Sequence, residues 1–233
     1  MKSRDGVTVV TRDGSGKAKP MPTDFRSVRS PQSSVLIRRL GLADYETTLH
    51  RMRDFTLTRV ADTPDEFWSV EHPPVYTLGV AAKPEHLPRA DNGIPVIKTD
   101  RGGQITYHGP GQVVIYTLLD LRRRNLGVRA LVRKLEQAVI ELLKAYRIDA
   151  MGREDAPGVY VDGAKVAALG LRIRNGCCYH GLSLNVDMAL APFGAINPCG
   201  YPGLEVTQLR DLGVAESMNA VTEKLLARLA AEL

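Results

Sequence analysis

The sequence predicts a soluble globular protein that mixes β-strands with α-helices behind a flexible N-terminal extension. Its 233 residues are 44% hydrophobic and 24% charged, which is ordinary for a soluble domain and supplies enough apolar side chains for a core. Several short segments alternate apolar and polar residues as strands do, and one long segment carries the apolar stripe of an amphipathic helix. The sequence has no run of about 18 apolar residues, so we expect no membrane span.

Residues 1–34 are polar and rich in Gly, Pro and Ser, and we expect a flexible extension followed by a single folded domain, residues 35–233. Residues 1–30 carry seven Lys or Arg and three Asp, so most of the formal charge of +5 lies in the extension. The near-neutral folded part argues against a nucleic-acid partner. Three cysteines without a CxxC motif, and no apolar leader, predict a cytoplasmic protein without disulfides or a zinc ribbon.

The folded part is expected to begin with a strand in "SVLIRRLG" (34–41) and a helix in 42–61, with Asp44 as its N-cap. The apolar face of this helix is predicted to hold Tyr45, Leu49, Met52 and Val60. Further strands are expected at "EFWSVE" (66–71), continued past a proline break by "HPPVYTLG" (72–79), at "IPVIKTD" (94–100) and at "QVVIYTLLDL" (112–121).

Residues 128–146 are predicted to form the most regular helix of the chain. Its apolar stripe is expected to comprise Leu131, Leu135, Ala138, Val139, Leu142 and Tyr146. Basic residues gather near its start, at 122–124 and at Arg129, Arg133 and Lys134. We interpret them as a solvated face, with an acidic protein partner as the alternative.

Asn175-Gly176, between two alternating segments, predicts a hairpin with a two-residue type I′ turn. This turn places Leu171 opposite His180 and Leu169 opposite Leu182. The face turned to the core is then expected to hold Leu169, Leu171, Ile173, Cys178, His180 and Leu182. The same alternation puts Lys165 and Ala167 on that apolar face, unless a bulge intervenes between 165 and 169.

Cys199 stands on a turn in "INPCGYPG", where side chains reach ligands more often than core, whereas Cys178 is expected to be buried. A nucleophilic thiolate needs a nearby cation or base, and the candidates are Lys165, His108 and His180. Lys165 in apolar surroundings would have a lowered pKa, although its amine could instead extend to solvent. His50, His72 and His86 are interpreted as structural or surface residues.

The stretch "RGGQITYHGPGQ" (101–112) has adjacent glycines that allow a ligand to approach the backbone, and His108 precedes a rigid Gly-Pro-Gly turn. A glycine-rich connection with a structural histidine is the alternative. The stretch matches neither a Walker loop nor a GxGxxG fingerprint, so we do not assign it to phosphate.

Four segments in this order resemble the lipoyl(octanoyl) transferase family: "EHPPVYTLG", "RGGQITYHGPGQVVIYTLLDL", "GVYVDGAKVAALGLRIRNGCCYHGLSLNVDM" and "FGAINPCGYPGLEVTQL". The similarity runs from about residue 35 nearly to the C-terminus. The resemblance implies an α+β fold of the biotin/lipoate protein ligase superfamily, with one mixed β-sheet backed by helices. It departs from the family at Ser183, where we expect Ala more often, and in the N-terminal extension.

The resemblance also implies the reaction. Family members move an octanoyl (or lipoyl) group from acyl carrier protein to a lysine of lipoyl domains, in 2-oxoacid dehydrogenase subunits and the glycine cleavage H protein, as the first step of protein lipoylation. No metal or other cofactor is expected. By resemblance Cys199 carries the acyl thioester and Lys165 lowers the pKa of that thiol. The residues that match substrate-binding segments are Arg101, Gly102, Gly103, Gln104, Ile105, Thr106, Tyr107, His108, Ala168, Leu169, Gly170, Gly181, Leu182 and Ser183.

Three other functions stay open at this point. An ATP-dependent lipoate or biotin ligase would use Lys165 but leave Cys199 without a role. A non-catalytic module that binds acyl carrier or lipoyl domains would need neither residue. A cysteine hydrolase would depend on His108 or His180. For the transferase, N–H groups around residues 181–183 are the expected oxyanion donors.

Overall fold

The computed structural model describes residues 10–12, 18–20, 35–88, 92–197, 200–201 and 203–233. Most of the predicted extension lies outside these residues, and so does Cys199. Within the extension, β1 (Val10–Arg12) pairs antiparallel with β2 (Ala18–Pro20). The predicted flexibility of residues 1–34 therefore stays a prediction.

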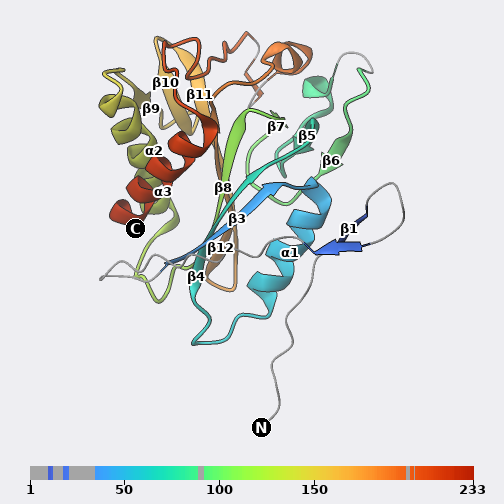
Figure 1. Cartoon of the computed structure of the whole chain (residues 1–233), viewed down its shortest axis with the longest axis vertical. Coiled ribbons are helices and arrows are strands. Elements are labelled where there is room, and N and C mark those ends of the chain that lie inside the picture. Colours follow the sequence, from blue (N-terminus) through green and yellow to red (C-terminus); the bar gives the residue numbers. More distant parts are fainter. Residues whose placement is uncertain (1–9, 13–17, 21–34, 89–91, 198–199, 202) are drawn as a thin grey trace.

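A seven-stranded sheet forms the centre of the molecule, in the order β3-β4-β8-β12-β11-β10-β9 (Figure 1). Its strands are β3 (Val35–Leu42), β4 (Asp65–Glu71), β8 (Gln112–Asp120), β12 (Cys177–Asn185), β11 (Ala164–Arg174), β10 (Gly158–Val161) and β9 (Met151–Gly152). β3 and β4 run parallel and the other neighbours antiparallel, so the sheet is mixed, as expected.

A second, three-stranded sheet has the order β6-β5-β7, with β5 (Val75–Leu78), β6 (Val96–Lys98) and β7 (Ile105–His108). The prediction that residues 72–79 extend the preceding strand is therefore wrong. Pro73 and Pro74 separate the two strands because a proline cannot donate a ladder hydrogen bond, and β5 enters the small sheet instead.

Helices cover both faces of the large sheet, and the α+β fold class is confirmed (Figure 1). α2 (Val128–Ala145) and α3 (Met218–Glu232) lie side by side and pack on one face, whereas α1 (Tyr45–Leu57) packs on the other. Short 3₁₀ turns lie at Pro84–His86 and Ala191–Ala195. Within the described residues, no helix has the length and hydropathy to cross a bilayer.

The structure confirms the predicted N-cap of α1 and most of the buried residues predicted for α1 and α2. The Asp44 carboxylate accepts a hydrogen bond from the Thr47 N–H at 2.8 Å, as an N-cap does. Tyr45, Leu49 and Met52 are buried, but Val60 is 70% exposed because the helix has already ended at Leu57. The stripe of α2 is buried as expected, with Tyr146 partly buried at the C-cap.

The basic residues before α2 are not uniformly solvated, which corrects that interpretation. Arg124 and Arg123 both bind the buried Asp65, at 2.5 and 2.6 Å, and Arg59 binds the same carboxylate at 2.5 Å. Arg124 also donates to the backbone carbonyl of Leu233 at 2.5 Å, which ties the end of α3 to this cluster. These arginines are structural, because three cations share one buried anion.

Candidate active site

A cavity of about 370 Å³ opens beside the hairpin β11–β12, within the size range of small-molecule sites (about 300–1,000 Å³). Nearly all the described residues of the predicted site line it. They are Arg101, Gly102, Gly103, Gln104, Ile105, Thr106, His108, Lys165, Ala168, Leu169, Gly170, Gly181, Leu182 and Ser183. Tyr107 is the exception, because it alternates to the other side of β7 and packs against Phe193 and Tyr76.

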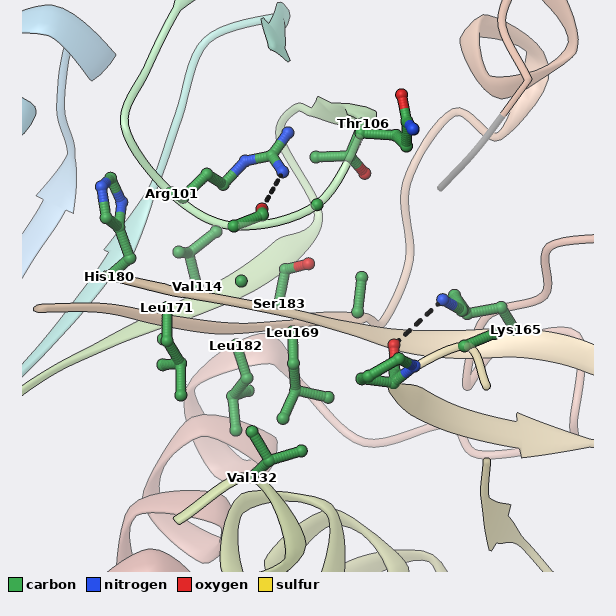
Figure 2. Close-up of a pocket in the computed structure, with 18 of the residues that line it drawn as sticks. Arg101, Thr106, Val114, Val132, Lys165, Leu169, Leu171, His180, Leu182 and Ser183 are labelled. Carbon is green, nitrogen blue, oxygen red and sulfur yellow. Dashed lines mark hydrogen bonds between the residues drawn. The ribbon is translucent and has the colours of Figure 1, made fainter. Parts of the chain in front are cut away.

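The hairpin has the predicted register, with Leu171 opposite His180 and Leu169 opposite Leu182. Leu169, Leu171 and Leu182 point toward α2, as predicted (Figure 2). His180 points the other way, so its predicted orientation is wrong. Its backbone is left-handed, with φ 63°, and this reversal places both Tyr179 and His180 on the α1 side of the sheet.

Lys165 is also on the opposite side of the sheet from these leucines (Figure 2). Tyr160 pairs with Lys165 and the preceding Val159 with Ala167, so Val166 is an extra residue in β11. This is the bulge that the alternation argument named as its exception, and it reverses the face of Lys165. The side chain is nevertheless buried, at 3% exposure, and lines the cavity.

Several groups surround the Lys165 ammonium. Its Nζ donates a hydrogen bond to the Pro157 carbonyl at 3.2 Å and lies 5.0 Å from the centre of the Tyr160 ring. A positive charge over a tyrosine face is stabilised by the ring quadrupole. The expected escape of this amine to solvent does not occur, because the amine is held inside the cavity wall.

The described residues that follow Cys199 lie against Lys165. The Lys165 N–H donates to Glu205 O at 2.8 Å, and the Thr207 N–H donates to Lys165 O at 3.0 Å. Gly200 lies against Gln104, since a Cβ at Gly200 would approach Gln104 Cγ to 2.8 Å. The chain therefore returns to the cavity directly after Cys199, and the Tyr201 side chain forms part of the wall.

His180 lines the end of the cavity opposite Lys165 and belongs to a group of hydrogen bonds centred on Asp100 (Figure 2). The Asp100 carboxylate accepts from His180 Nε2 at 2.9 Å, from the Tyr179 hydroxyl at 2.6 Å and from Arg53 Nε at 3.1 Å. Burial would raise the pKa of Asp100, but these three donors hold its pKa well below the usual range. Among the described residues, His180 Nδ1 has no hydrogen-bond partner.

Burial keeps His108 and His72 neutral at physiological pH. Burial lowers the pKa of His108 to about 3 and that of His72 to about 4. His108 Nδ1 is bonded to Gln112 Oε1 at 2.7 Å, and His72 contacts the Ala43 carbonyl and the Tyr116 hydroxyl, both at 2.7 Å. His180 and Lys165 stand at opposite ends of the site (Figure 2). Of the candidate partners for Cys199, Lys165 is therefore the one that lies at the same end of the cavity as the residues that follow Cys199.

Two glycines outside the 101–104 loop, Gly79 and Gly170, allow this loop to pack closely against the rest of the protein. A Cβ at Gly79 would come within 2.1 Å of Gly103 O, and one at Gly170 within 3.0 Å of Arg101 Cδ. The Gly102 N–H donates to Leu171 O at 2.8 Å, so the loop crosses directly over β11. Arg101 is fixed by hydrogen bonds to Thr77. Residues 101–104 therefore form the side of the cavity that faces β11 (Figure 2).

Two further observations bear on the predicted chemistry. Residues 181–183 belong to β12, which is paired on both sides, so their N–H groups are directed to neighbouring strands and the predicted oxyanion role is wrong. Cys178 is buried and burial raises its thiol pKa to about 12, which makes it a poor nucleophile. Within the described residues, no three His, Cys, Asp or Glu side chains are grouped as metal ligands.

Sequence reasoning did not identify part of the cavity wall. Tyr45, Val128, Val132 and Asp155 line it but carry no motif in the sequence. Asp100 directly precedes the glycine loop, and its partner His180 lies 80 residues away in the chain, so only the fold reveals the pair. The position of Asp100 directly before the predicted substrate-binding segment was the one sequence feature that could have indicated its role.

The sequence of the folded part matches a known protein family. Residues 44–230 match the model of the lipoyl protein ligase A/B catalytic domain. The chain belongs to this family. It is 62% identical over 197 residues to an octanoyltransferase of Laribacter hongkongensis, covering 84% of this chain and 95% of that protein. It is 58% identical over 212 residues to one of Nitrosospira multiformis, covering 91% and 98%.

A solved structure shows the same fold at low identity. A bipartite lipoate protein ligase, studied with its E2 lipoyl domain from Thermoplasma acidophilum, superposes with a TM-score of 0.65 at 17% identity, covering 85% of this chain and 84% of that one. The high identities to octanoyltransferases identify the present enzyme as an acyltransferase that moves octanoyl groups, in the first step of protein lipoylation.

Proposed function

We propose that the enzyme takes its octanoyl group from acyl carrier protein, holds it as a thioester on Cys199, and passes it to a specific lysine of a lipoyl domain. The observation that carries this mechanism is the placement of Lys165. It is buried in the cavity wall, and its backbone bonds the segment 205–207 that follows Cys199. Arg101–Thr106, His108, Ala168–Gly170 and Gly181–Ser183 form the acyl site in this proposal, and Tyr107 supports it from behind.

The two steps use the same thiol. The Cys199 thiolate attacks the donor thioester, so that a new C–S bond forms and the carrier leaves as a thiolate. The lysine amine of the lipoyl domain then attacks the acyl-enzyme, an amide C–N bond forms and the Cys199 C–S bond breaks. The Lys165 ammonium stabilises the Cys199 thiolate and gives its proton to the departing carrier thiolate. The neutral amine that remains accepts the proton of the incoming lysine, which restores the ammonium beside the released Cys199 thiolate. Because the donor is already activated, we propose no cofactor.

The proposed acceptors are lipoyl domains of 2-oxoacid dehydrogenase subunits and the glycine cleavage H protein, and the proposed location is the cytoplasm. A structural relative that was studied with a lipoyl domain supports this class of acceptor. Nucleic acid and membranes are not proposed as partners.

Intact-protein mass spectrometry with octanoyl-acyl carrier protein and no ATP tests the mechanism. We expect one octanoyl adduct, mapped to Cys199 by peptide analysis and absent from Cys199→Ala. Cys177→Ala and Cys178→Ala are the matched controls and should still acylate, because Cys177 and Cys178 are both buried. Strict dependence on ATP would instead identify a ligase, and transfer by Cys199→Ala at the normal rate would refute the thioester.

A further inference from the structure

One peptide unit, between Pro157 and Gly158, lies between two charged side chains. Its N–H, from Gly158, donates to Glu136 Oε1 at 2.9 Å, and its carbonyl, from Pro157, accepts from Lys165 Nζ at 3.2 Å. Because the N–H and C=O of a trans peptide point in opposite directions, the carboxylate and the ammonium lie at the two ends of one amide dipole. A negative charge on the N–H side polarises the amide and strengthens its carbonyl as an acceptor.

Glu136 is an unusual residue for its position. It lies on α2, whose buried face is otherwise apolar, and only 9% of it is exposed. Burial raises the pKa of Glu136, while the Gly158 N–H, the charge of Lys165 and that of Arg133 oppose the rise. A carboxylate in such a place costs free energy unless its partners compensate. Its partners here are the peptide and, across it, the catalytic lysine.

A glycine is required at position 158 for the Lys165 side chain to lie close to the Pro157–Gly158 peptide. The Gly158 φ of 150° is rarely adopted by residues with a side chain. A Cβ there would meet Ala167 O at 2.7 Å and the Lys165 side chain at 2.9 Å, at Cε. Only a glycine therefore allows Lys165 to lie against this peptide.

Among the described residues, the other groups around Lys165 do not supply a carboxylate in place of Glu136. The Tyr160 ring from β10 takes Lys165 Nζ on its face, but Arg153 lies over the same ring at 5.2 Å and its positive charge opposes that of the lysine. Arg153 is itself paired with Asp155. Glu205, from the segment after Cys199, is exposed and contributes its backbone carbonyl to the Lys165 N–H.

We propose that Glu136 is a positioning residue for the transfer reaction, which holds Lys165 in its ammonium form and in place through the Pro157–Gly158 peptide. This inference rests on the proposed role of Lys165 at the Cys199 thiolate. Glu136 touches no reacting atom in it and acts through the lysine alone.

The decisive measurement is the pKa of Lys165, read from the ¹⁵Nζ shift of lysine-labelled full-length enzyme and assigned with Lys165→Arg. In Glu136→Gln we expect the pKa of Lys165 to fall by about one pH unit, because the ammonium loses a nearby negative charge in a poorly solvated site. Glu154→Gln is the matched control. Glu154 lies between β9 and β10 and its side chain is 96% exposed, so the same charge change there should leave the pKa of Lys165 unchanged.

An unchanged Lys165 pKa in Glu136→Gln would overturn the inference while leaving the thioester mechanism intact. If Lys165→Ala acylates Cys199 at the normal rate, the proposed role of Lys165 fails instead. If the wild-type enzyme forms no octanoyl adduct on Cys199, the proposed function fails, so the three outcomes are separable. Should Glu136→Gln not fold, the wild-type enzyme suffices. As acid protonates Glu136, the Gly158 amide and the Lys165 Nζ signals should shift with one shared inflection, and separate inflections would refute the coupling.

Discussion

The two ends of the cavity bury charge in different ways. At one end, Asp100 receives three donors directly, from His180, Tyr179 and Arg53, and its hydrogen bonds join α1 to β12. At the other end, Lys165 donates to a neutral carbonyl, with the nearest supporting carboxylate one peptide away. The comparison leads us to expect that the directly paired Asp100 mainly stabilises the fold, whereas Lys165, whose supporting carboxylate lies across a peptide, can exchange a proton as the proposed mechanism requires.

Lys165→Ala should have the largest effect on activity. Loss of a group that stabilises a thiolate and moves a proton typically slows the step by about 10²- to 10⁴-fold. Rapid-quench measurement of octanoyl-adduct formation checks this expectation. Lys144→Ala, at an exposed position on α2, is the control and should acylate normally. If Lys165→Ala acylates as fast as the control, Lys165 has no part in acylation, and the proposed functional difference between the Lys165 end and the Asp100 end of the cavity is wrong.

Asp100→Asn should instead affect stability. The amide leaves at least one of the three donors unsatisfied, which costs about 1–3 kcal/mol of unfolding free energy. Urea unfolding measures the loss, with the exposed Asp149→Asn as control. Acylation by the folded fraction should change little, and a large loss of that rate would show that the Asp100 end takes part in the chemistry.

The pH dependence of stability should carry the signature of the neutral histidines. The pKa of His108 is about 3 when folded against about 6.5 when unfolded, so the unfolded state binds more protons as the pH falls. Its contribution to stability is therefore complete above pH 6.5 and lost between pH 6.5 and 3, at up to about 1.4 kcal/mol per pH unit. His108→Gln should flatten the measured slope from pH 6.5 to 5, whereas exposed His50→Gln should not.

Ser183→Ala should have the smallest effect. Ser183 lies between the two ends, opposite Ala168 in the hairpin, and its side chain faces the cavity. Removing one hydroxyl there should change the unfolding free energy by no more than about 0.5 kcal/mol. The acylation rate should stay within about twofold, which corresponds to a similar energy in the barrier. A larger rate change would assign the hydroxyl a contact with the acyl group.

Local chemistry made the strand pairing of the site predictable. Asn175-Gly176 specifies the turn, and a two-residue turn leaves a single register, so the opposition of Leu169 and Leu182 follows from the sequence alone. The N-cap Asp44 and the stripe of α2 are local in the same sense. α3 carries a weaker pattern, and we made no prediction for it.

The faces of Lys165 and His180 were not predictable in this way. An extra residue at Val166 and a left-handed backbone at His180 each reverse one side chain, and neither leaves a mark in an alternating pattern. Asp100 with His180 and Glu136 with Lys165 pair across long sequence separations, so tertiary packing decides them. The family resemblance supplied the candidate residues of the site, and the structure places the described ones, except Tyr107, around one cavity.

The parallel bridge between Lys165 and Val206 has a consequence for the length of the chain around Cys199. Surface loops usually accept insertions at little cost, since closure entropy grows slowly with length. Here the backbone of Lys165 anchors Glu205 and Thr207, and Gly200 is seated on Gln104. One residue inserted between them would add up to about 3.5 Å of chain, more than the tolerance of a hydrogen bond. The segment between Gly200 and Glu205 therefore has both ends held in contact with the cavity wall, and an insertion there would displace one of these contacts or bulge away from them.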